Sequence, residues 1–137
     1  MAFVLDASVT LGWLFPDEQN EFPQTILQRL GYEPAIVSSV WPLEVANGVL
    51  VAERRGRVST ADASLVHATL NDLPITVDPL GLDVALGQVL ALARNYRLSA
   101  YDASYLELAM RDGVPLATID RNPVSYTHLT LPTIYSV

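Results

Sequence analysis

Phe3-Val4-Leu5-Asp6-Ala7-Ser8 is the stretch that decides the fold. A short apolar run that ends in an acid is typical of a buried strand that delivers a carboxylate at its carboxyl end. Ser8 is predicted to cap the helix that follows, and its hydroxyl could also approach the same place as Asp6. Because open parallel sheets bind ligands outside the carboxyl ends of their strands, Asp6 is the first candidate for a functional site.

Three more acids stand in comparable places. Glu44 lies inside an amphipathic helical pattern, Asp102 begins another, and Asp120 directly follows the apolar run 115–119. Four carboxylates in one pocket would repel one another unless a cation neutralised them, and oxygen ligands suit Mg²⁺ or Mn²⁺. Taken singly, Asp102 could instead be a helix N-cap and Asp120 an ordinary turn acid.

Strand and helix patterns alternate along most of the chain. The predicted strands cover 3–5, 35–38, 74–77 and 114–119. The predicted helices cover 9–14, 22–30, 39–55, 60–73, 82–94 and 102–113. Such alternation predicts an α/β fold, with a parallel sheet covered by helices on both faces.

The composition changes abruptly at residue 122. No Asp, Glu, Lys or Arg occurs in residues 122–137, whereas charges recur throughout the preceding chain. We expect one domain over residues 1–121 and an atypical tail over 122–137, which is either non-native or an edge strand at 124–131. A chain of 137 residues is large enough to bury one core, so no second domain is expected.

Several classes of protein are disfavoured by composition. The absence of cysteine excludes disulfides and thiolate metal sites. The apolar runs are shorter than the roughly 18 residues of a membrane span, and no secretory signal is visible. These features predict a cytoplasmic protein that does not enter a membrane.

The formal charge of −7 argues against binding of nucleic acid, but only in part. Acids that hold cations present a different charge to a ligand than the net charge suggests. All eight basic residues are arginines, whose planar fork suits phosphate and carboxylate groups. Arg54, Arg55 and Arg57 form the basic cluster and are predicted to bind a partner; alternatively they complement the dipole at a helix end.

Four short motifs, in this order and separation, carry a resemblance to a known family. They are Leu5-Asp6-Ala7-Ser8, Glu44-Val45-Ala46-Asn47, Tyr101-Asp102-Ala103-Ser104-Tyr105 and Ala117-Thr118-Ile119-Asp120. Each motif alone is a weak signal, but together they resemble the PIN-domain nucleases, and in particular the VapC toxins of type II toxin–antitoxin pairs. The resemblance covers about residues 2–121.

The resemblance implies a three-layer α/β/α fold with a central parallel sheet of four to five strands. It also implies Mg²⁺- or Mn²⁺-dependent cleavage of RNA (tRNA, rRNA or mRNA), a cognate antitoxin and a homodimer. RNA or the antitoxin would bind at the arginine cluster. The family's site residues fall on the acids Asp6, Glu44, Asp102 and Asp120 and on the polar residues Ser8, Asn47 and Thr118. The chain departs from the family after Arg121, where Asn122-Pro123 replaces the start of a charged helix.

In this interpretation the carboxylates hold one or two ions that lower the pKa of a bound water, and no nucleophilic side chain is needed. His67 and His128 lie outside the motifs and receive no role. One alternative is a phosphoacceptor receiver domain, but that family relies on a strand-end lysine and this chain has no lysine. Another is an inactive PIN scaffold, which predicts missing acids, whereas all four are present.

Overall fold

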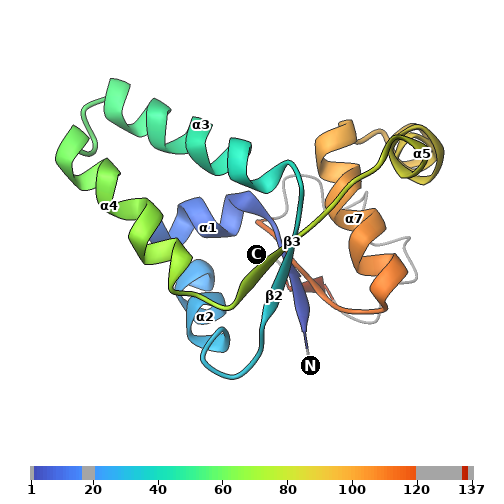
Figure 1. Ribbon diagram of the computed structural model, residues 1–137, viewed down its shortest axis with the longest axis horizontal. Helices are drawn as coiled ribbons and strands as arrows, with labels where there is room; N and C mark the ends of the chain where they lie inside the picture. Colours follow the sequence, from blue (N-terminus) through green and yellow to red (C-terminus); the bar gives the residue numbers. More distant parts are fainter. Residues whose placement is uncertain (1, 17–20, 120–133, 136–137) are drawn as a thin grey trace.

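Parallel strands form the central sheet in the order β3-β2-β1-β4-β5 in the computed structural model, which describes residues 2–16, 21–119 and 134–135 (Figure 1). The strands are β1 (Phe3–Leu5), β2 (Ala35–Ser38), β3 (Ile75–Asp78), β4 (Leu116–Ala117) and β5 (Ile134–Tyr135). Every strand pair runs parallel. The predicted parallel sheet is therefore confirmed.

Helices cover both faces of this sheet. They are α1 (Ala7–Leu14), α2 (Phe22–Arg29), α3 (Trp41–Arg54), α4 (Thr60–Asn71), α5 (Leu82–Val84), the π-helical segment η1 (Ala85–Val89), α6 (Leu90–Tyr96) and α7 (Ala100–Asp112). In Figure 1, α1 to α4 lie on one side of the strands, and α5 and α7 lie on the other. This arrangement is the three-layer α/β/α fold that the resemblance implied.

The strand order creates a crevice beside β1. The chain runs outward from β1 to β2 and β3, and then returns to place β4 on the other side of β1. Val4 pairs with both Ile36 of β2 and Leu116 of β4, so β1 is central. Ligands of open α/β sheets bind outside the carboxyl ends of the strands where the order reverses, which here means between the ends of β1 and β4.

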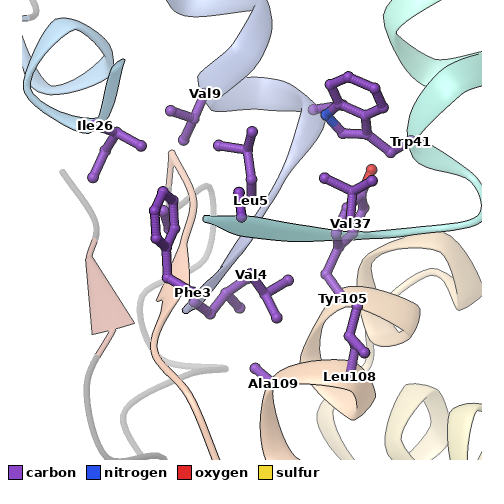
Figure 2. Close-up of a cluster of buried hydrophobic side chains, with 14 of the residues drawn as sticks. Phe3, Val4, Leu5, Val9, Ile26, Val37, Trp41, Tyr105, Leu108 and Ala109 are labelled. Atoms are coloured by element: carbon purple, nitrogen blue, oxygen red, sulfur yellow. The ribbon is translucent and has the colours of Figure 1, made fainter. Parts of the chain in front are cut away.

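The core surrounds β1, whose three side chains are all fully buried. Figure 2 shows Phe3 and Leu5 among apolar side chains from the flanking helices, including Val9 and Trp41. Tyr105 of α7 enters the same cluster and is only 1% exposed. A continuous apolar run suits a strand buried on both faces, and this burial fixes the direction in which β1 delivers Asp6.

Some predicted elements differ in extent. The fourth strand is limited to Leu116–Ala117, and the helix predicted over 82–94 runs over 82–96 with the π-helical segment η1 inside it. The edge strand predicted at 124–131 lies outside the described residues, while β5 pairs with β4 at Ile134 and Tyr135. No helix in the described ranges has the length and apolar character needed to span a bilayer.

Candidate active site

Asp6 directly follows β1 and caps α1. Its Oδ1 accepts the backbone N–H of Ser8 at 3.1 Å, and its Oδ2 accepts the hydroxyl of Thr118 at 2.6 Å. The backbone of Asp6 is extended, as an N-cap requires. Asp6 is therefore held in one orientation by groups from α1 and from the end of β4.

The prediction that Ser8 caps α1 is wrong, because the helix begins one residue before it and Asp6 supplies the cap. The Ser8 hydroxyl instead accepts the backbone N–H of Ile119 at 3.1 Å. This bond joins the start of α1 to the chain leaving β4. Aspartate and serine are comparably good caps, so sequence preference alone could not decide between them.

Burial raises the pKa of the Asp6 carboxyl above its usual range. The hydrogen bonds from Thr118 and from the backbone of Ser8 favour the ionised form and oppose the shift, whereas the nearby charge of Asp102 adds to it. A raised carboxyl pKa marks a place where negative charge is costly, as expected where acids gather in a cleft.

Glu44 enters from the first turn of α3 and is partly buried. Its Oε1 accepts the hydroxyl of Tyr105 at 2.5 Å, across the boundary between α3 and α7. Burial, followed by this hydrogen bond to Glu44, raises the pKa of Tyr105, so the phenol stays protonated and remains a donor. The family resemblance implies no role for Tyr105, although its position one turn after Asp102 places it on the same helix face as that acid.

Asp102 lies in the first turn of α7 and is not its cap. Ser99 is the cap, since its hydroxyl accepts the backbone N–H of Asp102 at 3.0 Å. The alternative role of Asp102 as an N-cap is therefore wrong. A buried pair of hydroxyls, Ser38 and Ser104, lies 2.7 Å apart and links the carboxyl end of β2 to α7.

A cavity of about 230 Å³ gathers most of the predicted site residues. It lies at the carboxyl ends of β1 and β4, and its lining includes Asp6, Ser8, Glu44, Asn47, Asp102 and Thr118. Asp120 lies outside the described residues. Within the described ranges, no three Asp, Glu or His side chains form a ready-made metal-binding group.

The apolar residues of this cavity were not predicted from the sequence. Leu11, Gly48, Leu98 and Ile119 complete the lining with Ala7. They come from α1, α3, the loop before α7 and the chain after β4, so no local pattern connects them.

A larger and more apolar cavity, of about 590 Å³, lies elsewhere between α3, α4 and β3. Its lining includes the exposed His67 and the apolar residues Val45, Val49, Leu70 and Ile75. None of the predicted site acids lines it. The smaller acidic cavity is therefore the candidate active site in spite of its size.

The arginine cluster lies at the far end of α3 from Glu44. Arg54 ends the helix, Arg55 is its C-cap, and all three arginines are exposed. The guanidinium of Arg57 lies 5.9 Å from the centre of the Phe15 ring, which is a cation–π distance. The structure thus places the cluster outside the acidic cavity.

Comparisons with known proteins identify the family of the chain. A family model described as "PIN domain" matches residues 3–128. Ribonuclease VapC9 of Mycobacterium tuberculosis is 34% identical over 118 residues, which are 85% of this chain and 84% of that protein. The crystal structure of PAE2754 from Pyrobaculum aerophilum superposes with a TM-score of 0.69 at 24% identity, covering 98% of this chain and 84% of that one.

A toxin–antitoxin complex from Klebsiella pneumoniae contains a chain with a TM-score of 0.65 at 18% identity, covering 98% of this chain and 94% of that chain. At such identities the solved structures establish the fold. The family follows from the domain match over most of the chain together with the extended similarity to VapC9. The chain belongs to the PIN-domain family and, within it, to the VapC ribonucleases.

Proposed function

We propose that this protein is a Mg²⁺- or Mn²⁺-dependent endoribonuclease and the toxin of a toxin–antitoxin pair. The observation that carries the proposal is the acidic cavity, where Asp6, Glu44 and Asp102 converge from β1, α3 and α7. Strands and helices that are far apart in sequence bring these acids to the crevice where α/β sheets bind ligands. The ribonuclease named among the relatives supports RNA as the substrate class.

The donor set of the cavity fits a hard divalent cation. Carboxylates supply the charge, and the hydroxyl of Thr118 and the amide of Asn47 supply further oxygen atoms nearby. Mg²⁺ keeps several of its waters and binds through one or two carboxylates plus substrate phosphate, so it does not need a closed protein cage. Asp6, Glu44, Asp102 and Asp120 are the proposed ligands.

A bound divalent ion would supply an activated water at neutral pH and neutralise charge on the phosphate. The chain's own contribution is orientation. Thr118 and the Ser8 amide fix both oxygens of Asp6, and Tyr105 fixes one oxygen of Glu44.

The arginine cluster is proposed to bind RNA phosphates or the antitoxin. Arg55 follows Glu44 by 11 residues, or about three helical turns, so both lie on one face of α3 about 16 Å apart. A single strand of RNA with its scissile phosphate at Glu44 could follow this face toward Arg54 and Arg55. Phosphate contacts of this kind position the substrate without reading its sequence.

An antitoxin partner, a homodimer and a cytoplasmic location complete the proposal. The fold shared with a chain of a toxin–antitoxin complex supports the first of these. RNA is a cytoplasmic substrate, which supports the third.

The test is incubation of total cellular RNA with the purified protein, with Mg²⁺, Mn²⁺ or EDTA, followed by mapping of cut sites. We expect discrete cuts that require a divalent ion and disappear in Asp6→Asn. Cuts that persist in EDTA would contradict metal dependence. Absence of cleavage with either ion, by a folded protein, would favour an inactive scaffold.

A further inference from the structure

The hydroxyl of Tyr105 lies where three elements of the site meet. It is carried by α7 on a side chain that is 1% exposed, and it donates to Oε1 of Glu44 on α3 at 2.5 Å. The charge of Asp6 and the backbone amide of Ala7, at the start of α1, both influence the pKa of this phenol. In Figure 2 the Tyr105 side chain extends from α7 toward the start of α3, which carries Trp41.

This hydrogen bond acts on a flexible side chain. Glutamate has three rotatable side-chain bonds, and holding such a side chain in one geometry costs conformational entropy. The Tyr105 ring, in contrast, is packed in the core cluster that also contains Leu5 and Val37, where close packing restricts its motion. A short bond from a rigid donor to a carboxylate is also of the strong, charge-assisted kind.

We propose that Tyr105 is a positioning residue of the active site, which orients the Glu44 carboxylate toward the cavity before any ion binds. This inference rests on the proposed metal-dependent function. Outer groups that orient metal ligands typically account for 10- to 100-fold in metal affinity.

The informative change is Tyr105→Phe, which removes one oxygen atom and keeps the ring and its packing. A matched control is Thr10→Val, which removes another buried hydroxyl bond: Thr10 Oγ1 accepts the indole N–H of Trp41 at 3.0 Å. Thr10 does not line the acidic cavity. Both variants should unfold at lower urea concentration than the wild type, so stability alone does not separate them.

The distinguishing readout is the dissociation constant for Mn²⁺ alone, measured by calorimetry without RNA. We expect about a tenfold increase in Tyr105→Phe and a change of less than about twofold in Thr10→Val. The same measurement on Glu44→Gln and on Glu44→Gln/Tyr105→Phe completes a double-mutant cycle for Mn²⁺ affinity. If Tyr105 acts through Glu44, adding Tyr105→Phe to Glu44→Gln should not weaken Mn²⁺ binding further.

The outcomes separate this inference from the proposed function. If the wild type binds Mn²⁺ and Tyr105→Phe binds it equally well, the positioning role is overturned while the metal-dependent function stands. An equal loss in Thr10→Val, or a loss that persists on the Glu44→Gln background, would also overturn it. A wild type that binds no Mn²⁺ would overturn both.

Discussion

The hydroxyl of Thr118 donates a 2.6 Å hydrogen bond to Oδ2 of Asp6, joining the ends of β4 and β1 although 112 positions separate the two residues. Beside it, the Ile119 amide donates to the Ser8 hydroxyl. These two side-chain bonds hold the segments that follow β1 and β4 together, just beyond the backbone hydrogen bonds of the two strands. They tie the geometry of the acidic site to the stability of the sheet.

Thr118→Val should lower the free energy of unfolding by about 1.5–3 kcal/mol, the range for a hydrogen bond to a charged group. Thr118 is 2% exposed, so water cannot easily replace the lost donor. Urea unfolding in EDTA at neutral pH measures the loss. Thr69→Val is the control, because the exposed Thr69 hydroxyl donates only to Leu65 in its own helix, and this change should cost less than about 0.5 kcal/mol. Equal effects would show that the Asp6 contact adds no stability.

Asp6→Asn should abolish RNA cleavage yet stabilise the metal-free protein at neutral pH. The amide oxygen can still cap α1, and the Thr118 hydroxyl can rotate to accept from the amide nitrogen. The change removes a buried negative charge whose cost is visible in the raised pKa of Asp6. Retained cleavage in this variant would remove Asp6 from the active site.

The pH dependence of that stabilisation has a definite sign. Since burial raises the folded-state pKa of Asp6 above its ordinary value of 3.8, the folded protein binds more protons than the unfolded chain between these two values. Stability of the wild type therefore falls as pH rises through this window. The advantage of Asp6→Asn should be absent below 3.8, grow through the window and then stay constant. Urea midpoints in EDTA across pH would show this, and a constant difference at every pH would contradict it.

Much of this architecture could be predicted from local patterns. The apolar run before Asp6 predicts a strand because β1 is buried on both faces, and the alternation of strands with amphipathic helices predicts the parallel sheet. The sequence Ser59-Thr60-Ala61-Asp62 is typical of a helix start, and the Ser59 hydroxyl does cap α4 by accepting the Asp62 amide. Such features depend on neighbours in sequence.

Other features depend on contacts between distant segments. The Tyr105–Glu44 bond spans 61 positions, and no spacing rule connects its two residues. The choice of Asp6 over Ser8 as helix cap follows from the Ile119 amide, which engages the Ser8 hydroxyl. The π-helical segment in 85–89 has no sequence signal that we recognise. Asp120, predicted from its place after the fourth strand, remains a prediction.

Replacing Arg54 and Arg55 with Gln should weaken binding of RNA or of the antitoxin and flatten its salt dependence. Each lost phosphate contact lowers the slope of log affinity against log salt by about 0.7 for single-stranded nucleic acid. Arg94→Gln/Arg97→Gln removes the same charge from exposed positions at the end of α6 and is the control. Binding is measured by fluorescence anisotropy at several salt concentrations.

Arg57→Gln is best added separately, because Arg57 also contacts Phe15. Suppose that the double variant Arg54→Gln/Arg55→Gln and the triple variant that adds Arg57→Gln both bind RNA and the antitoxin as tightly as the wild type does. That outcome would contradict the binding role and would mean that the arginines only complement the helix dipole at the end of α3.

Gly48→Ala should destabilise the protein because α1 passes too close to α3 for a side chain. A Cβ at Gly48 would overlap the end of Leu11 and lie 3.0 Å from its Cγ. Overpacking costs roughly 1–3 kcal/mol, whereas alanine gains about 1 kcal/mol over glycine in a helix, so a net loss of up to about 2 kcal/mol is expected. Because Gly48 follows Glu44 by one turn, Mn²⁺ affinity should fall as well.

Three further variants test that mechanism for Gly48: Leu11→Ala, Leu11→Ala/Gly48→Ala and Gly87→Ala. In a Leu11→Ala background the obstruction is gone, and Gly48→Ala should become neutral or stabilising. Gly87→Ala introduces the same residue in the π-helical segment, where a Cβ meets nothing within 4 Å, and should not destabilise. Urea unfolding of the wild type, Gly48→Ala, Leu11→Ala and the double variant shows whether the sign reverses. A loss of equal size in the Leu11→Ala background would rule out helix crowding as the cause.

Truncation after Arg121 should cost little stability. The removed segment carries no charged residue, and its described part, β5, contributes a two-residue parallel pairing with β4. Parallel pairs this short add few hydrogen bonds, and Pro123 and Pro132 cannot donate to a ladder.

Removing β5 would, however, expose the edge of β4, so the truncated protein should dimerise or aggregate more readily. Side-by-side urea unfolding and light scattering of the two proteins measure both effects. A loss of several kcal/mol, the scale of removing a packed element, would show that the tail is an integral strand of the sheet and that the boundary at residue 121 is misplaced.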